Sequence, residues 1–302
     1  MLKLNLQFKF FGLIILFMMF TTQTEAQIEH SYIDTVYSFT PGTGQNFGQS
    51  PEFFPMNIFG APAKEASEYI PASAESDVLS LGIDGEIIIG VKNMVIYDGE
   101  GDDFIIYENA FKNQATKKIF AEPATVAVSE DGLNYIEFPH DDWTLEGCAG
   151  KTPTNGSRDP FTQDSSGGDG FDIGKLGLEK IRYIKITDIS MVVTKDENHP
   201  YYFIEAMVTG FDLDAVACKY VYEADPALVQ DNVDYISTYP NRISINSEFD
   251  FEMQIFDIQG LLIEQIKNRG EYYYSTNDLV PGVYVIKFVS GNKTSTKLYL
   301  KY

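Results

Sequence analysis

Short apolar, β-branched runs recur along most of this 302-residue chain, each ended by a cluster of Gly, Asp, Asn or Pro. Such runs are typical of β-strands, and helical periodicity is largely missing apart from an expected short turn at Ala63–Tyr69. The pattern predicts an all-β protein with a sandwich fold. The expected strands are Glu86–Val91, Phe104–Tyr107, Ala124–Ser129, Tyr135–Phe138, Tyr183–Thr187 and Ala215–Val221.

Turn-forming clusters indicate how the chain is divided. Glu130-Asp131-Gly132, between two of those strands, suits a hairpin because Gly adopts positive φ without a steric penalty. The stretch Gly147 to Gly170 is rich in Gly, Ser, Thr, Pro and Asp, and a long surface loop is expected there. Glu223 to Asp234 is acidic and contains Pro226, which suits a linker. We expect one sandwich domain over residues 27–222 and a linker over residues 223–236.

A second alternating pattern occupies residues 237–302. Phe251 to Phe256 alternates apolar and polar residues and leads into the turn Asp257-Ile258-Gln259-Gly260. Pro281-Gly282 then supplies the bend before a Val/Tyr/Ile run, and the chain ends on a basic stretch. This pattern predicts a small Ig-like β-sandwich.

These C-terminal motifs, together with Tyr239-Pro240-Asn241 ahead of them, resemble the C-terminal sorting domain of type IX secretion substrates. Substrates of this kind come from Bacteroidetes-type bacteria. The resemblance implies that residues 237–302 are read by the type IX secretion machinery.

The N-terminal segment has the pattern of a secretory signal peptide. Lys3 and Lys9 flank or precede apolar residues, the apolar run Phe10 to Phe20 follows, and small Ala26 ends a polar stretch. The run is too short to cross about 30 Å of hydrocarbon permanently. Cleavage of residues 1–26 is expected, which leaves no transmembrane span in the mature chain. We expect passage through the periplasm, followed by secretion or attachment at the outer-membrane surface.

The net charge and the two cysteines limit which binding partners and which metal sites the protein can have. The formal charge is −22, and removal of Met1–Ala26 makes it −23. This acidity argues against nucleic acid and anionic membrane surfaces, which bind basic patches. Cys148 and Cys218 are the only cysteines and fit no zinc pattern. They could pair in an oxidising compartment or remain two separate buried thiols, and the sequence leaves both open.

Three motifs are prominent in the central domain. They are Leu79-Ser80-Leu81-Gly82 with Gly101 to Asn109, Phe120-Ala121-Glu122-Pro123-Ala124 with Val126 to Gly132, and Gly168 to Ile173 with Ile181 to Asp188 and Gly210 to Val216. Together they resemble a family of bacterial cell-surface domains over most of Val78 to Ala217. The resemblance implies a jelly-roll sandwich related to discoidin-type and galactose-binding-like modules. A sandwich fold does not by itself fix a ligand.

Acidic residues of these motifs are candidate ligands for a structural Ca²⁺, which takes six to eight oxygen ligands. An EF-hand is rejected, because position six of the Asp98–Asn109 segment is Asp103 rather than Gly and strand-forming residues follow. A site built from distant loops remains open, as does the alternative that the acids only cap turns. The proposed ligands are Asp103, Glu108, Asn109, Asp212 and Asp214.

A binding role fits the remaining features better than catalysis. Trp143 is the only Trp and lies in a polar stretch, so it is a candidate for stacking on an extracellular glycan or surface polysaccharide. The alternative is that Trp143 packs into the core. We expect a non-enzymatic binding or adhesion module. The competing hypothesis is a secreted glycan hydrolase, for which Glu108 and Asp214 would form the carboxylate pair.

Overall fold

The computed structural model describes residues 29–44, 46–224, 235–239, 242–291 and 293–301. The predicted signal peptide and most of the predicted linker lie outside the described residues. In those described ranges, no helix is long and apolar enough to cross a membrane.

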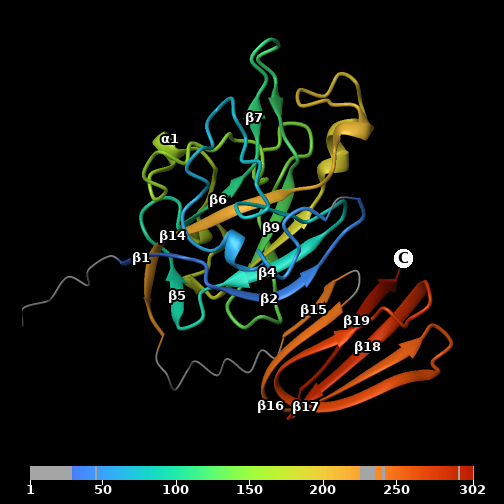
Figure 1. Cartoon of the computed structure of the whole chain (residues 1–302). Coiled ribbons are helices and arrows are strands. Elements are labelled where there is room, and N and C mark those ends of the chain that lie inside the picture. Colours follow the sequence, from blue (N-terminus) through green and yellow to red (C-terminus); the bar gives the residue numbers. More distant parts are fainter. Residues whose placement is uncertain (1–28, 45, 225–234, 240–241, 292, 302) are drawn as a thin grey trace, which may run out of the picture.

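The larger part of the chain is a two-sheet antiparallel sandwich (Figure 1). In the first sheet the strand order is β11-β6-β14-β5-β12, and β1 and β3 also pair with β14. In the second sheet the order is β10-β9-β13-β4-β2. The first sheet comprises β1 (Glu29–Tyr32), β3 (Leu79–Ser80), β5 (Met94–Tyr97), β6 (Phe104–Glu108), β11 (Asp169–Phe171), β12 (Lys180–Ile181) and β14 (Asp212–Glu223). The second comprises β2 (Thr35–Thr40), β4 (Glu86–Gly90), β9 (Ala124–Ser129), β10 (Ile136–Glu137) and β13 (Tyr183–Asp188).

The core lies between the two sheets because alternate residues of each strand point inward. In β13, Ile184 and Ile186 are fully buried, and they face Phe104 and Ile106 of β6 within one apolar cluster. Strand β13 pairs with β4 along one edge and with β9 along the other, so it is a central strand of its sheet. The predicted all-β sandwich is therefore confirmed.

The predicted strands agree with the structure to within one or two residues, except β14, which begins three residues earlier and ends two later than expected. The hairpin between β9 and β10 also forms, with Gly132 at a φ of 73°. The short turn expected at Ala63–Tyr69 forms, since Ala66 N–H donates to the Ala63 carbonyl. It does not extend into a helix: Gly156 N–H donates to the Ala66 carbonyl and Lys112 N–H donates to the Glu68 carbonyl.

Short helical turns and a small hairpin lie in the loops that connect the strands of the sandwich. The loop expected at Gly147 to Gly170 contains one helical turn and leads into β11. A small hairpin projects from one end of the molecule in Figure 1. These elements are α1 (Gln163–Ser166), the hairpin strands β7 (Phe111–Lys112) and β8 (Ile119–Phe120), and the 3₁₀ turns η1 (Met56–Ile58), η2 (Ile173–Leu176), η3 (Ser190–Thr194) and η4 (Glu205–Met207).

The C-terminal strands form a separate antiparallel sheet with its own core. Strand β16 is flanked by β17 on one edge, and by β15 and then β18 on the other; β19 pairs with β18. A bulge between Ser247 and Asp250 interrupts β16, and residues from both sides of it share one cluster. The strands are β15 (Tyr235–Tyr239), β16 (Arg242–Asp257), β17 (Leu262–Ser275), β18 (Gly282–Ser290) and β19 (Lys293–Lys301).

The Asp257–Gly260 turn shows how the motif works. The Asp257 carboxylate accepts the N–H groups of Gln259 (2.9 Å) and Leu261 (2.8 Å). Gly260 has a φ of 82°, a region that Gly enters at low cost. The turn therefore needs Asp at its start and Gly at its fourth position.

The two parts meet where β15 lies beside β2 (Figure 1). Lys297 of β19 is half-buried there, and its ammonium donates to the hydroxyl of Ser38 and lies 3.4 Å from that of Thr40. Burial lowers the pKa of Lys297 to about 8, against a raising influence from Glu86.

Candidate functional site

The five predicted calcium ligands lie in three places rather than one. Asp103 precedes β6 and Glu108 ends it. Five residues of extended strand put their backbones about 16 Å apart. Because Ca²⁺–oxygen distances are about 2.4 Å, Asp103 and Glu108 cannot share one ion.

Asp103 belongs to an acidic group on the loop before β6. Its carboxylate accepts the N–H groups of Gly99 (2.7 Å) and Ile173 (2.8 Å). Oxygens of Asp98, Asp103 and Asp172 all lie within 4.8 Å of one another. Burial raises the pKa of Asp103 to about 6, and Asp98 and Asp172 add to that rise. Asp103 thus fastens two loops and lies beside two further acids.

Glu108, Asn109 and Asp212 are kept together by the pairing of β6 with β14. Glu108 is opposite Leu213, so Asn109 and Asp212 lie on the next level of the ladder. Glu108 is 2% exposed and Asp212 is 7% exposed. Burial, followed by Glu122 and Asp212, raises the pKa of Glu108 well above its usual value.

Glu122 is a buried neighbour that the predicted ligand set did not include. It precedes β9, and its Oε1 accepts the N–H groups of Thr209 and Gly210. Burial, followed by the charge of Asp212, raises its pKa to about 8. The Phe120-Ala121-Glu122-Pro123 motif was the only sign in the sequence that Glu122 matters. Residue spacing could not show that Glu122, just before β9, lies near Asp212 at the start of β14.

Several oxygens near Asp212 lack partners. Ser80 is directly opposite Asp212 in the pairing of β3 with β14 and is fully buried. Among the described residues, the buried atoms Ser80 Oγ, Glu108 Oε2 and Asn109 Oδ1 have no hydrogen-bond partner. Buried polar atoms in native proteins are nearly always satisfied, so such a group of orphans requires an explanation.

Asp214 lies apart from Asp212. A bulge between Leu213 and Ala215 interrupts the ladder, and both oxygens of Asp214 face the N–H of Ala63, at 2.9 and 3.1 Å. Burial raises the pKa of Asp214 to about 8. Asp214 therefore anchors the loop that precedes β3.

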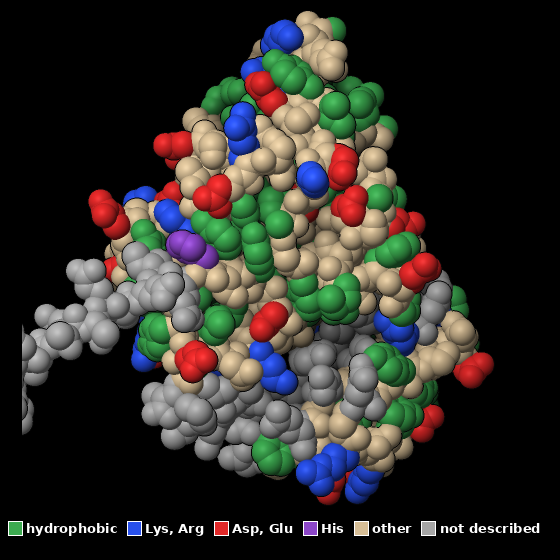
Figure 2. All heavy atoms as spheres, turned by 60° about the vertical axis from the view of Figure 1, so that its left-hand side comes forward, with side chains coloured by type: hydrophobic (Ala, Val, Ile, Leu, Met, Phe, Trp, Pro, Cys, Tyr) green, Lys and Arg blue, Asp and Glu red, His purple; other side chains and the backbone are tan. Residues whose placement is uncertain are grey.

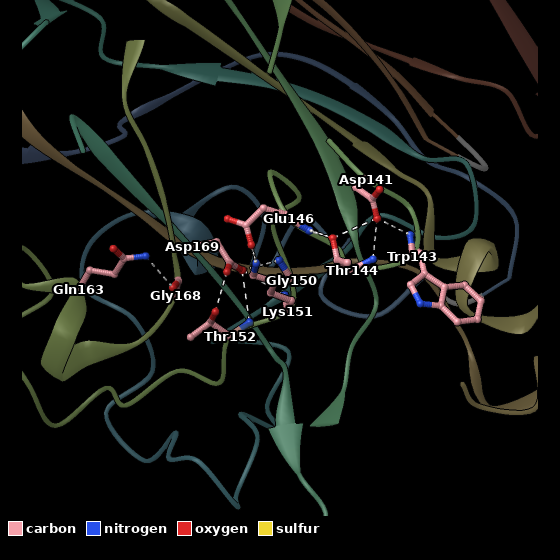
Figure 3. Close-up of polar contacts among 10 residues, drawn as sticks. All are labelled: Asp141, Trp143, Thr144, Glu146, Gly150, Lys151, Thr152, Gln163, Gly168 and Asp169. Atoms are coloured by element: carbon pink, nitrogen blue, oxygen red, sulfur yellow. Dashed lines mark hydrogen bonds and ion pairs between the residues drawn. The ribbon is translucent and has the colours of Figure 1, made fainter. Parts of the chain in front are cut away.

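Trp143 lies on a tight loop after β10. The Asp141 carboxylate accepts the N–H groups of Trp143 (3.0 Å) and Thr144 (2.7 Å), which holds the loop in shape. The indole is 46% exposed and meets the ring of His199 edge-on, with centroids 5.1 Å apart. In Figure 3 the indole points away from the residues grouped around Asp169. The expectation that Trp143 reaches solvent fits this geometry, and its ligand role stays a prediction.

The same loop continues into a pocket of about 350 Å³. Phe138 and Phe171 form its apolar part, with ring centroids 5.0 Å apart. Glu146, Lys151 and Gln163 are among the polar residues that line it. Sequence reasoning missed this pocket, because its walls come from separate segments that only the fold brings together.

Asp169 shapes the wall of that pocket (Figure 3). Its Oδ2 accepts the N–H groups of Gly150 (2.8 Å) and Lys151 (3.0 Å), and its Oδ1 accepts the Thr152 hydroxyl (2.7 Å). Lys151 Nζ in turn lies 2.7 Å from Glu146. The buried carboxylate thus fixes the chain segment that presents Lys151 to the pocket.

The cysteines are not joined. Cys148 and Cys218 are free and buried, and they lie in different apolar clusters. Burial raises the pKa of the Cys148 thiol to about 12, which keeps it protonated and unreactive at neutral pH. Of the two sequence alternatives, the structure has the separate buried thiols.

Comparison with known families assigns the C-terminal sheet. Residues 237–301 match the family described as "Secretion system C-terminal sorting domain". They form a sorting domain. The match supports a type IX secretion substrate, implies contact with the type IX machinery and indicates secretion.

Other comparisons leave the larger sandwich unassigned. No curated protein matches the chain. A b-glucuronidase from Ruminococcus gnavus in complex with uronic isofagomine is 11% identical, with a TM-score of 0.17; the match covers 78% of this chain and 46% of that one. The BSP domain of a biofilm associated protein is 10% identical, with a TM-score of 0.18, covering 93% and 53%. The chain spans about half the length of either structure, and likenesses this weak carry no argument.

Proposed function

We propose that the sandwich of residues 29–224 is a non-enzymatic binding or adhesion module that the sorting domain delivers to the cell exterior. Its ligand class is an extracellular glycan or surface polysaccharide, and calcium stabilises the module. The jelly-roll resemblance of the central motifs agrees with such a role but does not name the sugar.

The pocket bounded by Phe138, Phe171 and Lys151 carries this proposal. Its volume of about 350 Å³ is within the range of small-ligand sites. Phe138 and Phe171 are 6% and 3% exposed, so only a small part of each ring reaches the pocket. Lys151 and Gln163 provide hydrogen-bond donors for hydroxyl groups. A sugar unit presents both kinds of surface.

Trp143 extends the site. It belongs to the loop whose residues Glu146 to Cys148 line the pocket, although its ring points the other way (Figure 3). A chain of several sugar units could therefore contact both the pocket and Trp143, whereas a monosaccharide could contact only one of the two. On the face shown in Figure 2, acidic and basic side chains are interspersed.

A glycan array tests the proposal. We expect the purified mature protein to be retained on a restricted set of oligosaccharides. Lys151→Met removes a donor from the pocket but keeps the aliphatic stem, and we expect binding to fall at least about tenfold, the loss for one charged hydrogen bond. Trp143→Ala should weaken long glycans more than short ones.

Leu133→Ala is the matched control, because Leu133 is 83% exposed and lies outside the pocket lining. It should bind as the wild type does. Failure of the wild type to bind any glycan, or full binding by Lys151→Met, would contradict the assignment of this pocket.

The hydrolase alternative receives no support from its proposed pair. Glu108 is 2% exposed and Asp214 is 4% exposed, and both oxygens of Asp214 are bonded to Ala63. A glycosidase pair must flank the scissile bond of a bound substrate. Glycan turnover by the purified protein would nevertheless replace the binding proposal with an enzyme.

A further inference from the structure

We propose that His199 is the residue that positions Trp143: it fixes the peptide bond ahead of the indole and so sets the place of Trp143 relative to the pocket. This role rests on the proposed function, because it concerns how a long glycan would contact both the pocket and Trp143. His199 is not among the residues that line the pocket.

Both polar groups of the peptide bond between Asp142 and Trp143 have a partner. The Asp142 carbonyl lies 2.8 Å from Nε2 of His199. The N–H of Trp143 donates to the Asp141 carboxylate at 3.0 Å, as Figure 3 shows. Because a peptide unit is planar, these two contacts fix the orientation of the plane that carries the Cα atom of Trp143. The indole then has only two side-chain torsions left.

The imidazole of His199 is itself fixed. Its Nδ1 accepts the N–H of Tyr201 at 3.1 Å, so the ring proton is on Nε2, which donates to the Asp142 carbonyl. The backbone of His199 is also bonded on both sides: its N–H donates to the Asp196 carbonyl and its carbonyl accepts the N–H of Tyr202, each at 2.9 Å. At 4% exposed, His199 is a buried link between the loop after β10 and the loop after η3.

Trp143 is held on one side and still reaches solvent. Its indole meets the imidazole of His199 with 5.1 Å between the ring centroids and 69° between the ring planes. Even so, Trp143 is 46% exposed. An exposed aromatic side chain normally loses rotamer freedom when a ligand stacks on it, which lowers the affinity. The contacts with His199 remove part of that loss before the ligand arrives.

The other end of the same loop is fixed at the pocket. Leu145 is fully buried in an apolar cluster. The N–H groups of Gly150 and Lys151 donate to the buried carboxylate of Asp169. The spacing between Trp143 and the pocket is therefore set by the fold. Only an oligosaccharide long enough to span that spacing gains from a positioned Trp143.

Trp143 fluorescence tests the positioning without a glycan. Trp143 is the only tryptophan, so its emission and its quenching by acrylamide report on this loop alone in the mature full-length protein. His199→Phe keeps a buried ring but removes both nitrogens, and we expect a red-shifted emission and stronger quenching. His199→Gln keeps one donor and one acceptor and should resemble the wild type.

His199→Asn provides a milder change in case His199→Phe does not fold. Its shorter amide can accept from Tyr201 but is too short to reach the Asp142 carbonyl. We expect its emission and quenching to shift in the same direction as those of His199→Phe.

The glycan array then tests the consequence for binding. His199→Phe should lose about two- to tenfold in affinity for long oligosaccharides, the cost of ordering one side chain on binding, and should bind short ones as the wild type does. Binding of short glycans thus shows that the fold is intact. His30→Gln is the matched control, because His30 is exposed and stacks on Phe161 rather than on Trp143. It should match the wild type in both measurements.

Unchanged emission and quenching in both His199→Phe and His199→Asn would overturn the proposal. An equal loss of affinity for short and long glycans would also overturn it, since that is the result of a general loss of structure. A wild type that binds no glycan would instead overturn the proposed function, and fluorescence would still show whether His199 holds Trp143 in place.

Discussion

Asp214 shows at the level of one residue how this acidic protein handles buried charge. Its carboxyl group is 4% exposed and accepts only the N–H of Ala63 in the contacts described above. Burial outweighs that hydrogen bond and raises its pKa to about 8. The neutral acid is therefore the form that the folded protein prefers.

Stability should consequently depend on pH through Asp214. The folded pKa of about 8 exceeds the usual value of 3.8, so the native state holds one more proton than the unfolded state between those two values. The free energy of unfolding should fall as pH rises through this window, by up to about 1.4 kcal/mol per pH unit. Denaturant unfolding at a series of pH values measures the slope.

Asp214→Asn isolates this contribution. Asn cannot ionise, and its amide oxygen can still accept from Ala63. The variant should be more stable than the wild type at pH 8 and should differ least at pH 4. An unchanged slope would show that Asp214 is ionised in the folded protein.

At the scale of elements, the loop before β14 is fixed where its backbone passes close to the backbone of the loop after β3. Gly210 has a φ of +108°, and a Cβ there would come within 2.4 Å of the backbone of Gly82. The same loop presents its N–H groups to Glu122. This loop is therefore held at two points.

Gly210→Ala should destabilise the protein by about 2–4 kcal/mol, because both the φ angle and the contact with Gly82 must change. Gly101→Ala is the control: its φ is +80°, but a Cβ there meets nothing within 4 Å. It should cost about 1–2 kcal/mol, the left-handed penalty alone. If denaturant unfolding showed the same loss of stability for both variants, the contact between Gly210 and Gly82 would be loosely packed.

Sequence patterns predicted the strands well and the site less well. The strand Ala124–Ser129 was predicted to the residue, because apolar alternation and a Gly turn both mark it. The short turn at Ala63–Tyr69 does not grow into a helix, because Gly156 and Lys112 donate to the carbonyls of Ala66 and Glu68 in place of helical partners. Local propensity carries no information about such partners.

The predicted ligand set failed as one site for a geometric reason. Strand β6 separates Asp103 from Glu108, and the bulge after Leu213 separates Asp214 from Asp212. A bulge changes which face a side chain occupies, and the residues Leu213 to Ala215 give no sign of one. Glu108, Asn109 and Asp212 were placed together because their strands pair directly.

For the whole molecule, two separate cores imply two separable tasks. The core of the larger sandwich and that of the sorting domain share no residues. Removal of residues 237–302 should therefore abolish delivery to the cell exterior and leave the sandwich folded. Cell fractionation and melting of the retained protein measure the two effects.

Fusion of residues 223–302 to an unrelated periplasmic protein is the reciprocal control and should cause its export. Export of the tail-deleted chain at the wild-type level would show that the sorting domain is dispensable.

Lys297 joins those two parts by an unusual bond. Its ammonium is held by the hydroxyls of Ser38 and Thr40, and burial has already weakened its hold on the proton. Hydroxyls are poor rivals to a carboxylate for a cation. The contact between Lys297 and these hydroxyls can therefore be lost without opening either fold, while β15 still lies beside β2.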